Sequence, residues 1–156
     1  MKLYKAFFLF FLIVSCQNDI DDVIVDSDVT STVLVEINKL RVTGCQCGEE
    51  YMPPVSPLVS NSILSKTAIN QAHDMNVRNY FDHISPEGIS PIQRAVYFGY
   101  TGTYVGEVIA KNYTNSVEVV AGWKNSPDHC KAMMDGIYIE MGAGKSGSIW
   151  VANFGK

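Results

Sequence analysis

Apolar residues recur at helical spacing after position 30. Positions 33, 34, 37 and 40 are apolar, and spacings of three and four residues place such side chains on one helix face. Thr30 or Ser31 supplies an N-cap hydroxyl, and Gly44 supplies a C-terminal stop. These features predict a first helix that begins after Thr30 or Ser31 and ends at Gly44.

A second helix is predicted where Asn61 or Ser62 precedes another apolar stripe. The members of this stripe are Leu64, Ala68, Ala72 and Met75. Between the two helices, residues 48–57 contain three prolines, which lack the backbone donor that regular structure needs. We therefore expect a loop there.

Three shorter helices follow in the pattern. The pairs Ser90-Pro91 and Ser126-Pro127 each place a capping hydroxyl before a proline at the first helical position. A further helix is expected to start between them, at Ser116.

The C-terminal part changes to the pattern of strands. Residues 137–143 and 148–154 are predicted strands, and the turn-forming residues between them indicate a hairpin. Residues 104–110 are a candidate for a third strand. Helices followed by a terminal hairpin predict an α+β fold, with helices packed on a small antiparallel sheet.

The chain begins with the residue order of an export signal. Two lysines within the first five residues precede an unbroken apolar run over residues 6–14, followed by the small Ser15. This order is typical of a signal peptide, and the run is shorter than the about 20 apolar residues of a membrane-spanning helix. We therefore expect residues 1–15 to direct export and to be removed.

Residues 13–16 also resemble the lipobox of bacterial lipoproteins, in which the final cysteine, here Cys16, receives a lipid. An ordinary secretory signal with a chance cysteine is the alternative. Residues 16–30 are rich in Asp and lack apolar periodicity, which predicts a flexible acidic tether. Residues 31–156 remain as one folded domain. We expect an extracytoplasmic protein anchored at a bacterial membrane through lipid, facing the periplasm or the cell surface.

The charge of the chain narrows the class of partner. The formal net charge is −4 at pH 7, and lysines and arginines do not cluster. A nucleic-acid partner would require such a cluster, so nucleic acid is excluded as a partner. After the export signal, the sequence contains no second apolar run long enough to span a membrane.

Three cysteines follow the export signal, at Cys45, Cys47 and Cys130. An exported domain with few cysteines is a candidate for a disulfide. Cys45 and Cys47 are too close in sequence to pair comfortably, so one of them is expected to bond to Cys130. A zinc site made from the same cysteines is the alternative, although zinc ligands usually have a wider Cys spacing.

Common catalytic signatures are missing from the sequence: it has no His-Glu-x-x-His pair, no Gly-x-Ser-x-Gly elbow and no phosphate-binding glycine loop. Three short motifs remain. His83 lies in YFDHISPEG over residues 80–88, Glu107 in GEVIA over residues 106–110, and His129 in WKNSPDH over residues 123–129.

In this order, with Arg94 and Gly99-Tyr100 between the first two, the motifs resemble those of the CAP superfamily. That group includes cysteine-rich secretory proteins, insect venom antigens and plant pathogenesis-related proteins, and the similarity is to its short bacterial branch. It extends from about Val33 to the C-terminus. The resemblance implies a three-layer α-β-α sandwich with an open central cleft.

The resemblance places His83, Glu107, Ser126 and His129 in that cleft. Neutral imidazoles suit zinc or a similar divalent ion, so His83 and His129 are the candidate metal ligands. With one acid and open positions, the site would bind a metal reversibly, and no cofactor is required.

The sequence also departs from the family motifs. The Asn that follows the acid in the family is Val108 here. The family's aromatic-Trp-Thr-Gln near the C-terminus is here Ile149-Trp150-Val151-Ala152, which keeps the Trp and lacks the Gln. Related bacterial domains have a Cys-Gly in the first loop and a His-Cys at the cleft helix. This implies a bond between Cys47 and Cys130 with Cys45 free, and closing so long a loop stabilises a domain by several kcal/mol.

We expect a non-enzymatic binding module for a small ligand, a lipid, a divalent metal or an extracellular protein partner. The alternative is a metal-assisted, peptidase-like hydrolase, in which water on a metal held by His83 and His129 is the nucleophile and Glu107 is the general base. A nucleophilic Cys130 activated by a histidine is a third possibility, which the disulfide disfavours.

Overall fold

The computed structural model describes residues 27–156. The predicted export signal, Cys16 and the acidic segment up to residue 26 lie outside the described residues. The helices are α1 (Ser27–Thr43), α2 (Ser62–Arg78), α3 (Pro91–Tyr97), α4 (Ser116–Asn125) and α5 (Pro127–Met134). The strands are β1 (Cys45–Cys47), β2 (Glu50–Met52), β3 (Val59–Ser60), β4 (Val105–Lys111), β5 (Glu140–Ser146) and β6 (Ile149–Gly155).

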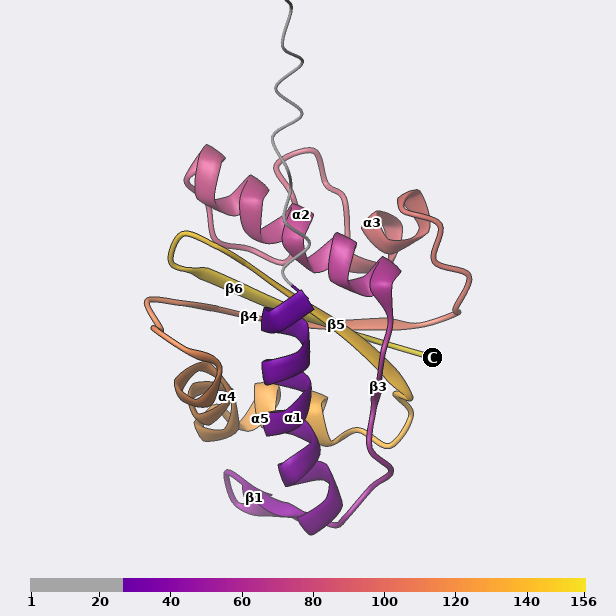
Figure 1. The fold of residues 1–156 in the computed structure, drawn as a ribbon, viewed down its shortest axis with the longest axis vertical. Coiled ribbons are helices and arrows are strands. Elements are labelled where there is room, and N and C mark those ends of the chain that lie inside the picture. Colours follow the sequence, from indigo (N-terminus) through magenta and orange to yellow (C-terminus); the bar gives the residue numbers. More distant parts are fainter. Residues whose placement is uncertain (1–26) are drawn as a thin grey trace, which may run out of the picture.

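The elements form three layers around a four-stranded sheet (Figure 1). The strand order is β3-β5-β6-β4, and the strands pair antiparallel except for the parallel pair of β3 and β5. Helices α2 and α3 lie on one side of the sheet, and α1, α4 and α5 lie on the other (Figure 1). The predicted α+β class and the α-β-α sandwich are confirmed.

Helix α2 packs on the sheet with the apolar stripe that the sequence predicts. Ala68, Ala72 and Met75 are buried against residues of β4 and β6. Asn61 caps the helix, and its side chain accepts hydrogen bonds from the backbone nitrogens of residues 63 and 64. Gly144 on β5 faces this helix, and a Cβ there would collide with the α2 backbone. The close approach of helix and strand therefore requires glycine.

Helix α1 begins earlier than the sequence pattern predicts. Residues 27–30 were expected in the acidic tether, but they form its first turn. Thr30 is 4% exposed; its hydroxyl donates to the Ala143 carbonyl at 2.8 Å and accepts from the Ala143 backbone nitrogen at 3.2 Å. The hydroxyl thus binds β5 instead of capping a helix, and the folded domain starts before residue 31.

The predicted loop over residues 48–57 is wrong in its first part. β2 pairs antiparallel with β1, so that Cys45 faces Met52 and Cys47 faces Glu50. Gly48 has a φ of +63°, which suits the tight turn between the two strands. The three prolines follow β2, and because proline has no backbone N–H, they cannot donate the hydrogen bonds that would extend the pairing.

The disulfide that the resemblance implies is confirmed. Cys47 on β1 bonds to Cys130 on α5, with 5.4 Å between their Cα atoms and 83 positions between them in sequence. Cys45 is a free, buried cysteine. The bond ties the small hairpin to the helix that carries His129.

Buried Arg41 holds the segment that leads into β5, a strand that starts at Glu140 and not at residue 137 as predicted. Its guanidinium donates to the carbonyls of Met133 at 2.7 Å, Asp135 at 2.9 Å and Tyr138 at 3.1 Å. Within the predicted strand, the carbonyl of Tyr138 is thus bound by a side chain and not by a neighbouring strand. Among residues 27–156, no helix combines the length and the apolar character that crossing a membrane requires.

Candidate functional site

Glu107 is the centre of a buried polar network on β4, one of the two edge strands of the four-stranded sheet. Its side chain is 1% exposed. Oε1 bonds to Nδ1 of His83 at 2.9 Å, and Oε2 accepts from Nη2 of Arg94 at 2.8 Å. With its amide nitrogen turned toward the carboxylate, Asn153 donates to Oε2 at 3.1 Å from the facing position on β6. Both carboxylate oxygens are therefore bonded and shielded from solvent.

Arg94 fixes the loop that carries His83 beside this carboxylate. Its side chain is 6% exposed and extends from α3. Nη1 donates to the carbonyl of Ile89 at 2.8 Å, and Nη2 donates to the carbonyl of His83 at 3.0 Å. Helix α3 begins just before it, where Gln93 accepts from the Ser90 backbone nitrogen at 2.9 Å. The guanidinium thus holds both ends of the 83–89 loop.

His83 presents one ring nitrogen outward. The carboxylate of Glu107 accepts hydrogen bonds only, so neutral His83 carries its proton on Nδ1. Its Nε2 has no hydrogen-bond partner among the described residues, and the side chain is 44% exposed. The hydrogen bond to Glu107 raises the pKa of His83, against the effect of partial burial. The imidazole is therefore oriented, electron-rich and open at Nε2.

His129 lies in the first turn of α5. With Ser126 and Trp123 it lines a cavity of about 290 Å³, and neither His83 nor Glu107 is among the residues that line this cavity. Burial lowers the pKa of His129, the charge of His83 lowers it further, and Asp128 opposes both effects. His129 is therefore a neutral imidazole at neutral pH.

Glu107 is bonded to the Nδ1 atom of His83 and is shielded from solvent, so its position suits a residue that orients an imidazole better than a residue that binds a metal directly. Within residues 27–156, the one group of three potential ligands whose donor atoms all lie within 4.8 Å of one another is the cysteine group, not His83, Glu107 and His129. A carboxylate that holds the far nitrogen of a metal-binding imidazole is a common arrangement in metal sites. The residues that would hold a metal here are thus His83 and His129, with Glu107 behind His83.

Residues 34–154 match the profile of the cysteine-rich secretory protein family, CAP. The chain belongs to the CAP family. The Bacillus subtilis (strain 168) protein YkwD is 39% identical over 108 residues, which cover 68% of this chain and 42% of YkwD. This chain thus spans less than half the length of that relative.

Solved CAP structures share the fold. An extracellular protein with an SCP domain from Bacillus anthracis superposes with a TM-score of 0.73 at 22% identity, over 83% of this chain and 40% of that one. An outer surface protein from Borrelia burgdorferi superposes with a TM-score of 0.68 at 22% identity, over 81% of this chain and 90% of that one.

The two departures from the CAP motifs lie opposite each other in the sheet. Val108 replaces the Asn after the acid, and Ala152, two residues after Trp150, stands in place of the Gln. The register pairs Val108 with Ala152, and both belong to the apolar core shared with α1 and α4. Because strand side chains alternate between faces, these positions face away from Glu107. The departures therefore leave the carboxylate network intact.

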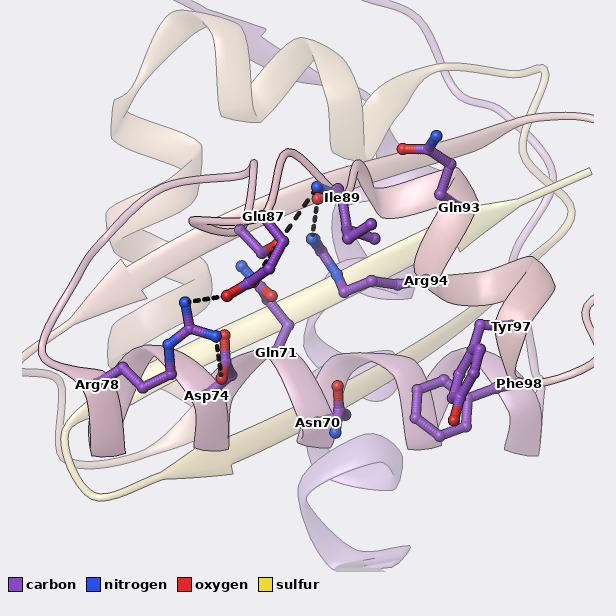
Figure 2. A pocket seen from close by; sticks show the side chains of 11 residues that line it. Asn70, Gln71, Asp74, Arg78, Glu87, Ile89, Gln93, Arg94, Tyr97 and Phe98 are labelled. Carbon is purple, nitrogen blue, oxygen red and sulfur yellow. Dashed lines mark hydrogen bonds and ion pairs between the residues drawn. The ribbon is translucent and has the colours of Figure 1, made fainter.

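A second cavity, of about 420 Å³, lies between α2 and α3. Figure 2 shows Arg78, Asp74 and Glu87 at one end and Tyr97 and Phe98 at the other. Arg78 bonds to Glu87 at 2.7 Å and to Asp74 at 3.4 Å. The sequence did not predict this cavity, because three separate segments form it.

Arg94 and Asn153 are the site residues that sequence reasoning did not assign. Arg94 was recognised only as part of the family resemblance, and its spacing from the histidine motif was the available signal. Asn153 stands one residue after the position of the missing family Gln. Only strand pairing places it opposite Glu107.

Proposed function

We propose that this protein is a non-enzymatic, extracytoplasmic binding module whose cleft binds a divalent metal ion, or a small ligand, between His83 and His129. The observation that carries the proposal is the orientation of His83. Its Nδ1 is held by buried Glu107, so the unprotonated Nε2 keeps a lone pair that can bind a metal ion or accept a hydrogen bond. A lipid or an extracellular protein partner at a neighbouring surface stays a prediction.

The charge states of the two imidazoles support reversible metal binding. Metal ions require deprotonated imidazole, and burial keeps His129 neutral. His83 binds protons more readily, because its hydrogen bond to Glu107 raises its pKa. Affinity for a metal should therefore fall as the pH is lowered and His83 becomes protonated.

The position of Glu107 favours binding over hydrolysis. A general base must reach the water that it deprotonates. Glu107 is 1% exposed, and both of its oxygens are already bonded. The hydrolase alternative thus lacks an accessible base at this residue.

Zinc titration by isothermal calorimetry of the exported protein, purified in its oxidised form, tests the cleft. We expect one bound zinc ion per chain at micromolar affinity, and at least tenfold weaker binding for His83→Ala and for His129→Ala. His73→Ala is the matched control, because His73 is an exposed histidine on α2. Absence of binding in the unaltered protein, or equal affinity in all three variants, would overturn the metal proposal.

We propose that the signal of residues 1–15 exports the protein, and that a lipid on Cys16 then anchors it to a membrane on the side away from the cytoplasm. An acyl chain contributes about 0.8 kcal/mol per buried CH₂, so more than one chain anchors firmly. Cys16→Ser should move the protein from the membrane fraction to the soluble extracytoplasmic fraction. Unchanged membrane association of this variant would contradict the lipid anchor.

A further inference from the structure

Three cysteine sulfurs meet in an apolar pocket at the end of the molecule opposite α2. Sγ of Cys45 lies 3.7 Å from Sγ of Cys130 and 3.9 Å from Sγ of Cys47. Cys45 is 8% exposed, Cys47 1% and Cys130 0%. The disulfide uses two of the three sulfurs and leaves the third in contact with both.

The backbone directs these sulfurs to one point. Cys45 and Cys47 alternate with exposed Gln46 on β1, so both side chains face the same way. Cys130 approaches them from the first half of α5. Two of the ligands come from a short hairpin and one from a helix, and the hairpin pairing with β2 keeps the first two in register.

The distances from Cys45 match those between ligands of a zinc ion. A tetrahedral site with Zn–S bonds of about 2.3 Å places its sulfurs about 3.8 Å apart. Cys45 already stands at 3.7 Å and 3.9 Å from the other two. After reduction, the Sγ atoms of Cys47 and Cys130 have only to move apart by a similar distance. The three sulfurs then occupy three corners of a tetrahedron.

The surroundings suit a metal–thiolate centre of low net charge. Burial raises the pKa of the Cys45 thiol, and the positive charge of Lys124 opposes this shift. Met134, Leu40 and Met52 pack around the sulfurs. A thiol in this pocket stays protonated until a metal cation displaces the proton, and Lys124 partly balances the negative charge that the complex carries.

We propose that Cys45, Cys47 and Cys130 are a redox-controlled zinc site, in which the disulfide and a bound zinc ion are alternative states of the same three residues. A dithiol reductant transfers two electrons to the disulfide and becomes a disulfide itself, while its two protons end on Cys47 and Cys130. Zinc then replaces the three thiol protons, giving a tris-thiolate complex of charge −1 and three protons in solvent. Water takes the fourth position.

The cysteine site shares no ligand with the proposed histidine cleft, although Cys130 directly follows His129 in α5, and its proposal does not depend on the proposed function. Cobalt(II) is a suitable probe, because thiolate ligands give it an intense near-ultraviolet charge-transfer band that imidazole ligands do not. The exported protein is reduced with a dithiol, freed of reductant without air, and titrated with cobalt(II). We expect the band to saturate at one ion per chain, and to be absent from the oxidised protein.

Two variants decide the assignment. Cys45→Ala keeps the disulfide and folds as the oxidised form does, and after reduction it should bind cobalt(II) at least tenfold more weakly. The double variant His83→Ala/His129→Ala should keep the full band. Absence of the band in the reduced unaltered protein, or unchanged affinity in Cys45→Ala, would overturn the proposal.

A thermal measurement separates a folded site from chelation by an unfolded chain. A ligand that binds only the folded state raises its stability by mass action. Zinc should therefore raise the melting temperature of the reduced protein, with a smaller rise for reduced Cys45→Ala. A full cobalt band without any rise in melting temperature would mean that the unfolded chain binds the metal, and would overturn the proposal.

Discussion

The two walls of the proposed cleft, one carrying His83 and the other His129, are held in place by different interactions. His83 is positioned by a buried ion pair, in which Arg94 and the His83 imidazole bond to opposite oxygens of Glu107. His129 is the residue before Cys130, whose disulfide ties α5 to β1. One wall thus depends on electrostatics and the other on a covalent bond. The pKa values of the two histidines also shift in opposite directions: the hydrogen bond to Glu107 raises the pKa of His83, whereas burial lowers the pKa of His129.

The difference teaches how each wall can fail. A buried ion pair is sensitive to the removal of either partner, because the remaining charge is left without compensation. A disulfide is broken by reduction, but its cysteines do not titrate, so its contribution to stability does not depend on pH in the same way. Perturbing the walls one at a time should therefore separate their contributions.

We expect the largest loss of stability when the disulfide that holds the His129 wall is removed. Cys130→Ala removes the disulfide, whose loop spans 83 positions, and the chain-entropy estimate for such a loop is about 4.5 kcal/mol of unfolding free energy. Urea denaturation in the presence of a metal chelator measures the loss. Cys45→Ala is the matched control and should cost about 1 kcal/mol, for one small buried group. Equal losses in the two variants would contradict a stabilising role for the disulfide.

We expect the next largest loss of stability when the buried ion pair that holds the His83 wall is broken. Glu107→Gln keeps the shape of the side chain but leaves buried Arg94 without its counter-ion, which should cost about 3 kcal/mol of unfolding free energy. Glu36→Gln is the control, because its ion pair with Lys39 lies at the surface and should contribute less than about 0.5 kcal/mol. A loss in Glu107→Gln as small as that of the control would show that the network does not hold this wall.

The opposite proton affinities of the histidines give a third test. Glu107→Gln should lower the pKa of His83, because the hydrogen bond to the carboxylate is the main cause of its rise. His83→Ala should raise the pKa of His129, because it removes a neighbouring positive charge. Both values are measured by NMR titration of the imidazole signals. An unchanged His129 pKa in His83→Ala would mean that the two walls are electrostatically independent.

The smallest effect is on the pH dependence of stability. The pKa of His83 is raised above its ordinary 6.5, so its contribution is complete below pH 6.5 and is lost as the pH rises through the folded-state value. The pKa of His129 is lowered, so stability falls as the pH drops below 6.5 toward its folded-state value. Solvent screening should keep each effect below about 1 kcal/mol.

Urea denaturation between about pH 5 and pH 8, the range in which histidine titrates, measures both slopes. His83→Gln should remove the decline above pH 6.5, and His129→Gln should remove the decline below it. Each variant thereby serves as the control for the other. If either variant removes both declines, the assignment of one slope to each wall is wrong.

The sequence by itself determined the helices, the fold class and the family. The stripe of Ala68, Ala72 and Met75 is local in sequence and predicts a buried face whatever it packs against. The prolines of the pairs Ser90-Pro91 and Ser126-Pro127 start α3 and α5 for equally local reasons, although the predicted capping by the Ser126 hydroxyl is wrong, because that side chain makes no cap hydrogen bond. The histidine and glutamate motifs lie in short segments whose order and spacing carry the resemblance.

The tertiary structure alone decided which residues contact one another. Asn153 lies opposite Glu107 because of strand register, and Thr30 is buried because β5 pairs with its hydroxyl. Arg94 reaches Glu107 from a different helix, and Cys45 meets the disulfide across 85 positions of sequence. Such contacts join segments that are far apart in the sequence, and the number of residues between two segments does not tell whether they lie close together in space. Local pattern therefore predicts elements, whereas packing decides which polar groups find a partner.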